Sequence, residues 1–122
     1  VINVSGHRMS TAEIEHTVIS HKKISDAASI AIPDDITGEA IVVFFVSDDN
    51  SKINESEITD YISEKIGKVA KPKHVYQLSD LPKTRTGKIL RRLLKSKLLG
   101  MELGDLSSLE NPHVLDEINK KS

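Results

Sequence analysis

Two neighbouring apolar runs limit what this chain can fold into more than any other feature of its sequence. Residues 26–33 (DAASIAIP) and 39–47 (EAIVVFFVS) are both rich in β-branched side chains, which favour strands. The residues between them, within PDDITG, have the composition of a turn. Because so short a connection joins antiparallel strands, we expect the two runs to pair with each other.

The flanking segments predict a second hairpin and three helices. The first ten residues (VINVSGHRMS) are expected to turn at Ser5-Gly6, and Thr11 can cap the helix that follows. Asn54 can cap a second helix that ends at Gly67, with isoleucines repeating every four residues. The remaining predicted elements are a strand, a loop, a helix and a polar tail, over residues 74–78, 79–87, 88–99 and 101–122.

This order of elements predicts one α+β domain. We expect a small mixed sheet of about three strands plus an N-terminal hairpin, flanked by about three helices. With no Trp, two Phe and two Tyr in 122 residues, the core must be built from Ile, Val, Leu and Ala. No Cys is present, which fits a reducing compartment such as the cytoplasm, and no apolar run reaches the ~20 residues of a membrane span. The chain opens with Val in a strand pattern, so we expect a fragment of a longer protein.

The basic residues are concentrated in one segment. Residues 83–97 contain seven Lys or Arg and no Asp or Glu. Since the whole chain has a net charge of −1 with neutral His, the remainder carries −8. This asymmetry favours an anionic partner at one place over general binding of nucleic acid.

The Gly87-Lys88 pair in this segment suggests contact with a phosphate. It is not part of a P-loop, because that motif needs a glycine and a hydroxyl residue where this chain has Pro82 and Ile89. We expect Lys88 on a flexible loop at the start of the last helix, where its ammonium could reach a phosphoryl or carboxylate oxygen. The alternative is an ordinary solvated lysine.

The VSGHR stretch near the N-terminus is a second candidate site. Gly6 allows a ligand or a backbone to approach closely, and the guanidinium of Arg8 could fork onto a phosphate. Taken alone, the same residues describe a plain turn.

Taken together, the two stretches indicate a protein family more specifically than either does alone. INVSGHRMSTAEIE, followed about seventy residues later by LPKTRTGKILRR, resembles the C-terminal domain of adenylate-forming acyl-CoA synthetases. The segments GKVAKPKHVYQLSDLPKTRTGK and GDLSSLENPHVLDEI are similar to the AMP-forming acetyl-CoA synthetases of that superfamily. The resemblance implies that residues 1–100 are a mobile C-terminal domain and 101–122 its tail, and that the N-terminal adenylation domain is absent from this sequence.

The resemblance also implies a reaction and residue roles. Acetate would be activated with ATP to acetyl-AMP and its acetyl group transferred to coenzyme A (CoA), the domain rotating between these half-reactions. Lys88 matches the catalytic lysine that meets the carboxylate and the α-phosphate. Ser5 and Gly6 match positions that contact the CoA pantetheine, and Arg8 matches a nucleotide-phosphate contact. The implied cofactors are ATP, CoA and Mg²⁺.

Two further implications concern a metal and a missing arginine. The family has an arginine that contacts CoA where this chain has Ser63, with Lys65 or Lys68 as candidate substitutes. A metal site at the end of the first helix is also implied, with the matching positions Ile19, His21 and Ile24, the two Ile through their backbone carbonyls.

The expected partners follow from these roles. They are the protein's own N-terminal adenylation domain, acetate, ATP and CoA, with neither nucleic acid nor a membrane. An exposed Lys88 would also be accessible to a protein acetyltransferase and deacetylase, and acetylation would remove its charge. The alternatives are a basic-helix module for nucleic acid and a non-catalytic interaction module. Only the synthetase interpretation assigns Lys88 alone to an ATP-dependent step, with four neighbours as a solvated electropositive surround: Lys83, Arg85, Arg91 and Arg92.

Overall fold

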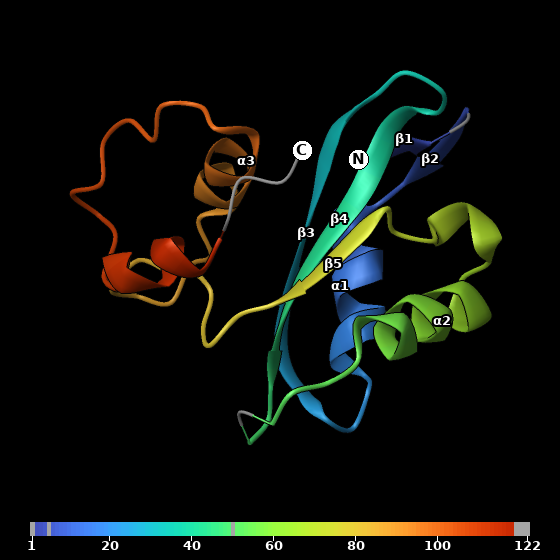
Figure 1. Cartoon of the computed structure of the whole chain (residues 1–122), viewed down its shortest axis with the longest axis horizontal. Coiled ribbons are helices and arrows are strands. Elements are labelled where there is room, and N and C mark those ends of the chain that lie inside the picture. Colours follow the sequence, from blue (N-terminus) through green and yellow to red (C-terminus); the bar gives the residue numbers. More distant parts are fainter. Residues whose placement is uncertain (1, 5, 50, 119–122) are drawn as a thin grey trace.

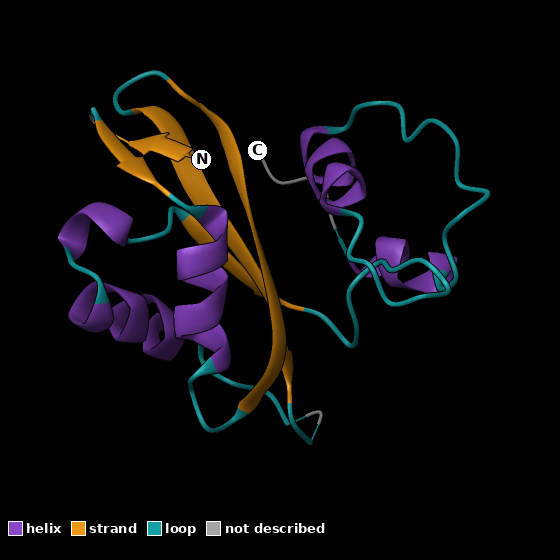
Figure 2. Ribbon diagram, turned by 180° about the vertical axis from the view of Figure 1, so that it is seen from behind, coloured by secondary structure: helices purple, strands orange, loops and turns teal. Residues whose placement is uncertain are grey.

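The two apolar runs form the long antiparallel hairpin that their sequence predicts. β3 (Ile24–Asp34) pairs with β4 (Gly38–Ser47) along its whole length, in a register that sets Ile30 opposite Val42. Helices cover both faces of this hairpin (Figures 1 and 2), so side chains on both faces are buried. Burial on both faces is the reason why these strands are almost continuously apolar instead of alternating.

Three short strands complete a five-stranded sheet in the computed structural model, which describes residues 2–4, 6–49 and 51–118. The N-terminal pair forms the expected hairpin, and the last strand runs parallel to β4 while the other described pairs are antiparallel. Because β3 occupies one edge of β4, β1 and β5 share the other edge. The sheet is therefore mixed, as predicted. The added strands are β1 (Ile2–Val4), β2 (His7–Met9) and β5 (His74–Gln77).

Two helices cover one face of the sheet, α1 (Thr11–Ile19) and α2 (Glu55–Lys65). The cap of α1 is Ser10, whose hydroxyl accepts a hydrogen bond from the N–H two residues later (3.2 Å). Thr11, the predicted cap, is instead the first helical residue. Asn54 caps α2 as predicted, with a bond of 3.0 Å to the N–H two residues on. A short 3₁₀ turn, η1 (Lys68–Ala70), follows α2.

The opposite face is covered by α3 (Arg91–Leu99) and by the C-terminal segment, which includes the 3₁₀ helix η2 (Pro112–Glu117). α3 begins three residues later than predicted. The C-terminal segment was predicted as a polar tail, because its apolar residues follow neither a helical nor a strand period. Several of these apolar residues are nevertheless buried against the sheet. The buried side chains of this segment are Leu109, Val114, Leu115 and Ile118.

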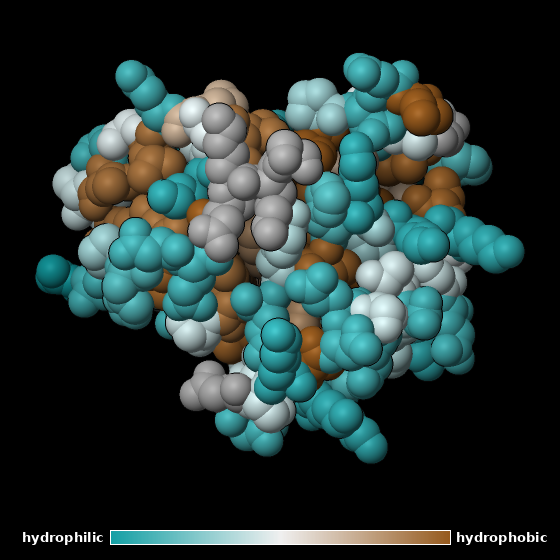
Figure 3. Space-filling model, viewed as in Figure 1, coloured by the Kyte–Doolittle hydropathy of each residue, from teal (hydrophilic) through white to brown (hydrophobic). Residues whose placement is uncertain are grey.

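The surface has apolar as well as polar areas. Apolar side chains reach the surface over the segment that follows α3 (Figure 3). Met101 and Leu106, both in this segment, are 57% and 37% exposed. Among the described residues, no helix has both the length and the apolar character needed to cross a membrane.

Candidate active site

Lys88 lies on a hydrogen-bonded hairpin of residues 83–89, called here the Lys88 hairpin. Lys83 and Ile89 form an antiparallel bridge across its base. Inside it, the N–H of Thr84 donates to the carbonyl of Lys88 (2.9 Å), and the N–H of Lys88 donates to the Thr84 hydroxyl (3.1 Å). Gly87 adopts a φ of +93°, which favours glycine. The predicted loop is therefore a hairpin whose backbone is hydrogen-bonded on both sides of Gly87.

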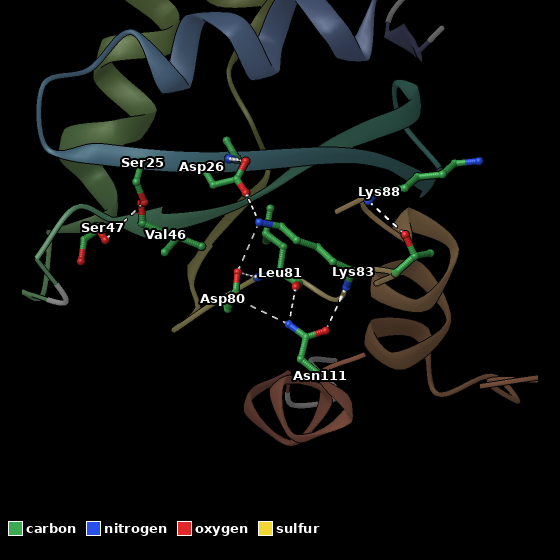
Figure 4. Close-up of polar contacts among 11 residues, drawn as sticks. Ser25, Asp26, Val46, Ser47, Asp80, Leu81, Lys83, Lys88 and Asn111 are labelled. Atoms are coloured by element: carbon green, nitrogen blue, oxygen red, sulfur yellow. Dashed lines mark hydrogen bonds and ion pairs between the residues drawn. The ribbon is translucent and has the colours of Figure 1, made fainter. Parts of the chain in front are cut away.

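Lys88 is also not at a helix start. α3 begins at Arg91, and the amides that favour anions belong to its first turn, after Lys88 in the chain. The side chain of Lys88 is exposed and points away from the polar contacts that anchor the hairpin (Figure 4). The described part of the chain offers its ammonium no ion-pair partner. The ammonium is therefore free to meet an anion from outside the chain.

A polar network ties the base of the Lys88 hairpin to the rest of the domain (Figure 4). The Nζ of Lys83 lies 2.8 Å from Oδ2 of Asp26 on β3 and 3.6 Å from Oδ1 of Asp80. The hydrogen bond to Asp26 raises the pKa of Lys83 above its ordinary value, so this lysine stays charged. The side-chain amide of Asn111 accepts from the Lys83 N–H (3.0 Å) and donates to the Leu81 carbonyl (2.8 Å).

A second ion pair fixes the start of α3. Arg91 donates from Nε and Nη2 to the two carboxylate oxygens of Glu15 on α1, at 2.7 and 2.6 Å. Glu15 also accepts a hydrogen bond from the N–H of Ser29 on β3 (2.7 Å). The bond to Glu15 raises the pKa of Arg91. The buried Glu15 carboxylate thus joins two helices and the edge of the sheet.

These contacts correct the predicted solvated surround of Lys88. Lys83 and Arg91 are both paired with carboxylates, and Arg92 donates to the carbonyls of Leu103 (2.8 Å) and Asp105 (2.7 Å). The Nε of Arg85 lies 3.7 Å from Oε2 of Glu110, but its side chain is 90% exposed, so Arg85 matches the expectation of a solvated charge. The sequence did not show that the other three are engaged, because their partners lie far away in the sequence or are main-chain carbonyls.

The glycine turn of the second candidate site lies on another part of the fold. Gly6 has a φ of +83° and open space where a side chain would project, and Arg8 is exposed on β2 opposite Asn3. Ser5 lies outside the described residues. The β1–β2 hairpin joins the edge of β4 away from β3, whereas the Lys88 hairpin is anchored to β3 through Lys83. The chain does not bring the two candidate sites together.

The implied metal site does not fit the side chain of His21. Its Nε2 lies 2.9 Å from Oε2 of Glu57, and its Nδ1 accepts a hydrogen bond from the N–H of Lys23 (3.1 Å). Among the described residues, no group of three or more His, Cys, Asp or Glu could hold a metal ion. A site based on the carbonyls of Ile19 and Ile24 stays a prediction.

The substitutes for the missing arginine differ in their availability. The hydroxyl of Ser63 is buried without a hydrogen-bond partner in the described structure, so it does not face a ligand. Lys65 holds its ammonium 5.5 Å from the centre of the Tyr61 ring, a cation–π contact. Lys65 and Lys68 are both exposed, Lys68 on η1, and the cation–π contact distinguishes Lys65.

Residues 13–88 match the model of the AMP-binding enzyme C-terminal domain, and the chain therefore belongs to this family. It is 41% identical over 121 residues to an acetyl-coenzyme A synthetase of Methanothrix thermoacetophila, and 46% identical over 125 residues to acetyl-coenzyme A synthetase 2 of Candida albicans. Both alignments cover 97% of this chain, which spans only 18% and 19% of the two relatives.

Solved structures support the same family. The chain superposes on an acyl-CoA synthetase of Brucella canis with a TM-score of 0.72 and 27% identity, over 77% of this chain and 18% of that one. A fatty acyl CoA synthetase of Mycobacterium tuberculosis gives a TM-score of 0.70 and 30% identity, over 78% and 19%. The resemblance predicted from the sequence is confirmed.

Proposed function

We propose that this chain is the C-terminal domain of an AMP-forming acetyl-CoA synthetase. The observation that carries the proposal is 41–46% identity to acetyl-coenzyme A synthetases over nearly the whole chain. In the first half-reaction an acetate oxygen attacks the α-phosphorus of ATP, and pyrophosphate leaves. In the second, the CoA thiol attacks the acetyl carbonyl carbon of acetyl-AMP, and AMP leaves as the thiol proton is released.

Lys88 acts in the first half-reaction. Negative charge develops on phosphoryl oxygens as the adenylate forms, and a fixed cation stabilises that charge. The exposed ammonium on a hydrogen-bonded hairpin suits this role, because the hairpin holds the backbone from which the side chain extends and leaves the ammonium open to a ligand. ATP would bring Mg²⁺ as its counterion.

The β1–β2 turn acts in the second half-reaction. Gly6 leaves room for the pantetheine arm of CoA, and the exposed Arg8 is available to a phosphate. Because this turn and the Lys88 hairpin lie toward opposite edges of β4, a rotation of the domain would exchange one for the other at a single active site on the adenylation domain.

Acetylation of Lys88 would regulate the first half-reaction. The side chain is exposed on a hairpin, so a protein acetyltransferase and a deacetylase could reach it. Acetylation replaces the ammonium by a neutral amide and removes the charge that the adenylation step needs. The cytoplasm remains the compartment expected for such an enzyme.

A nucleic-acid-binding module is not supported. Binding to a phosphate backbone requires free cations along one face. Here Lys83 and Arg91 are engaged by carboxylates, and Arg92 is engaged by main-chain carbonyls. Three of the seven basic residues of this segment are therefore engaged within the chain, and the segment offers fewer free cations than its sequence suggests.

The proposal is tested by comparing the chain alone with the enzyme that carries it. The enzyme should catalyse acetate-dependent exchange of pyrophosphate into ATP and form acetyl-CoA. The chain alone should do neither, because it has no adenylation domain in its sequence. An enzyme without acetate-dependent exchange, or acetyl-CoA formation by the chain alone, would contradict the proposal.

A further inference from the structure

The C-terminal segment holds the Lys88 hairpin from outside. Residues 109–117, called here the C-terminal clamp, lie along the first strand of the hairpin. Thr84 and Leu109 form an antiparallel bridge, and the N–H of Glu110 donates to the carbonyl of Lys83 (2.9 Å). The backbone of Lys83 is therefore held on both sides, by its own hairpin partner Ile89 and by the clamp.

Asn111 makes the central contacts of the clamp. Its amide oxygen accepts from the N–H of Lys83 (3.0 Å), and its amide nitrogen donates to the carbonyl of Leu81 (2.8 Å) and lies 3.4 Å from Oδ2 of Asp80. An amide can accept and donate at once, which a carboxylate or a hydrophobic side chain of similar size cannot do. The next residues form η2, in which the N–H of Val114 donates to the Asn111 carbonyl (3.2 Å) and the side chains of Val114 and Leu115 are buried.

We propose that Asn111 is a positioning residue for Lys88, acting through the first strand of the Lys88 hairpin. The inference rests on the catalytic role proposed for Lys88. Asn111 fixes Lys83, Lys83 pairs with Ile89, and Lys88 lies next to Ile89 on the second strand. Because a displacement of about 1 Å at a catalytic group can cost about 10²-fold in rate, loosening this strand should slow adenylation without removing the ammonium.

The clamp lies outside residues 13–88, which match the family model. The family match ends at residue 88, and the two solved acyl-CoA synthetases cover only 77% and 78% of the chain. The alignments with acetyl-coenzyme A synthetases cover 97% of it and so include most of the clamp.

The test compares Asn111→Ala with Glu117→Ala. Glu117 lies on the same clamp and accepts hydrogen bonds from the N–H and the hydroxyl of Ser79, and among the described residues it makes no hydrogen bond to the hairpin. Amide hydrogen exchange of Thr84, Gly87 and Lys88 is measured first in the chain. In Asn111→Ala these amides should exchange at least about tenfold faster relative to those of β4, and in Glu117→Ala they should not.

The second measurement uses the enzyme that carries the chain. Asn111→Ala should lower acetate-dependent pyrophosphate exchange by about 10- to 100-fold and leave thioester formation from supplied acetyl-adenylate within about twofold. Should Asn111→Ala not fold, Asn111→Asp removes the donor to Leu81 and sets a second carboxylate beside Asp80, and it should shift both measurements in the same direction.

Three results would overturn the inference. They are unchanged hairpin exchange in Asn111→Ala, equal effects of Asn111→Ala and Glu117→Ala, and an adenylation rate within about twofold of wild type despite faster hairpin exchange. Failure of the proposed function is recognised separately, because it would show as a Lys88→Ala enzyme with normal adenylation. In that case the positioning role falls with it, while hydrogen exchange still reports whether the clamp holds the hairpin.

Discussion

Removing the guanidinium of Arg91 should destabilise the fold far more than its place in a basic sequence suggests. Arg91→Ala loses two charge-assisted hydrogen bonds to Glu15, whose side chain is only 8% exposed and keeps the N–H of Ser29 as its donor. Removing one partner of a fully buried pair costs about 3–5 kcal/mol. Because the Arg91 side chain is 42% exposed, water offsets part of this, and we expect a loss of about 2–3 kcal/mol.

Thermal unfolding followed by circular dichroism measures this loss. With an unfolding entropy of about 2.1 cal/mol/K per residue, a chain of 122 residues shifts its midpoint by about 4 °C for each kcal/mol. Arg91→Ala should therefore melt about 8–12 °C below wild type. Arg92→Ala is the matched control, because it removes the same charge from the next position but breaks bonds to exposed loop carbonyls, for a cost below about 1 kcal/mol. Equal midpoints for the two variants, or a shift below about 2 °C for Arg91→Ala, would refute the claim that the Arg91–Glu15 ion pair stabilises the fold.

Two further predictions concern a turn and a carboxylate. Gly6→Leu should lower thioester formation while pyrophosphate exchange is retained. Gly104→Leu controls for backbone strain, because Gly104 has a similar φ of +73° against +83° for Gly6. A parallel fall of both half-reactions in Gly6→Leu would count against the role assigned to Gly6. The N–H of Thr37 and the ammonium of Lys73 hold the pKa of Asp34 well below its ordinary 3.8, so its stabilising effect is complete above that pH and is lost as the pH falls. Urea midpoints from about pH 6 down to about pH 3 should therefore fall less steeply for Asp34→Asn than for wild type, and identical slopes would contradict this.

The sheet and the helices of one face could be predicted because their signals are local. The composition of β3 and β4, the turn between them, and the cap at Asn54 are each contained in a few neighbouring residues. The start of α3 could not be predicted, because the apolar period continues back through Ile89 and Leu90. There the bridge from Ile89 to Lys83 and the hydrogen bond from the Leu90 N–H to the Pro82 carbonyl (2.8 Å) override the tendency to form a helix.

The motif residues of the candidate site could be proposed from the sequence, whereas the residues that anchor them could not. The motif around Lys88 and Gly87 is readable in the sequence, and so is the family. The anchors Glu15, Asp26 and Asn111 are not, because each pairs with a residue 28 to 76 positions away, and no local spacing records such a contact. The signal that was available for Glu15 is its place beside the apolar stripe of α1, where a charge is rarely buried without a partner.

Separate measurement of the two half-reactions in Lys88→Ala tests the assigned role of Lys88 most directly. Acetate-dependent pyrophosphate exchange should fall by about 10²–10³-fold, while thioester formation from supplied acetyl-adenylate stays within about twofold of wild type. Arg85→Ala removes a charge from the same hairpin and should leave both rates nearly unchanged, because its ion pair with Glu110 (3.7 Å) joins two side chains that are 90% and 60% exposed and contributes little. If the exchange rate of Lys88→Ala stays within about twofold of wild type, or falls no further than that of Arg85→Ala, Lys88 is not the catalytic lysine.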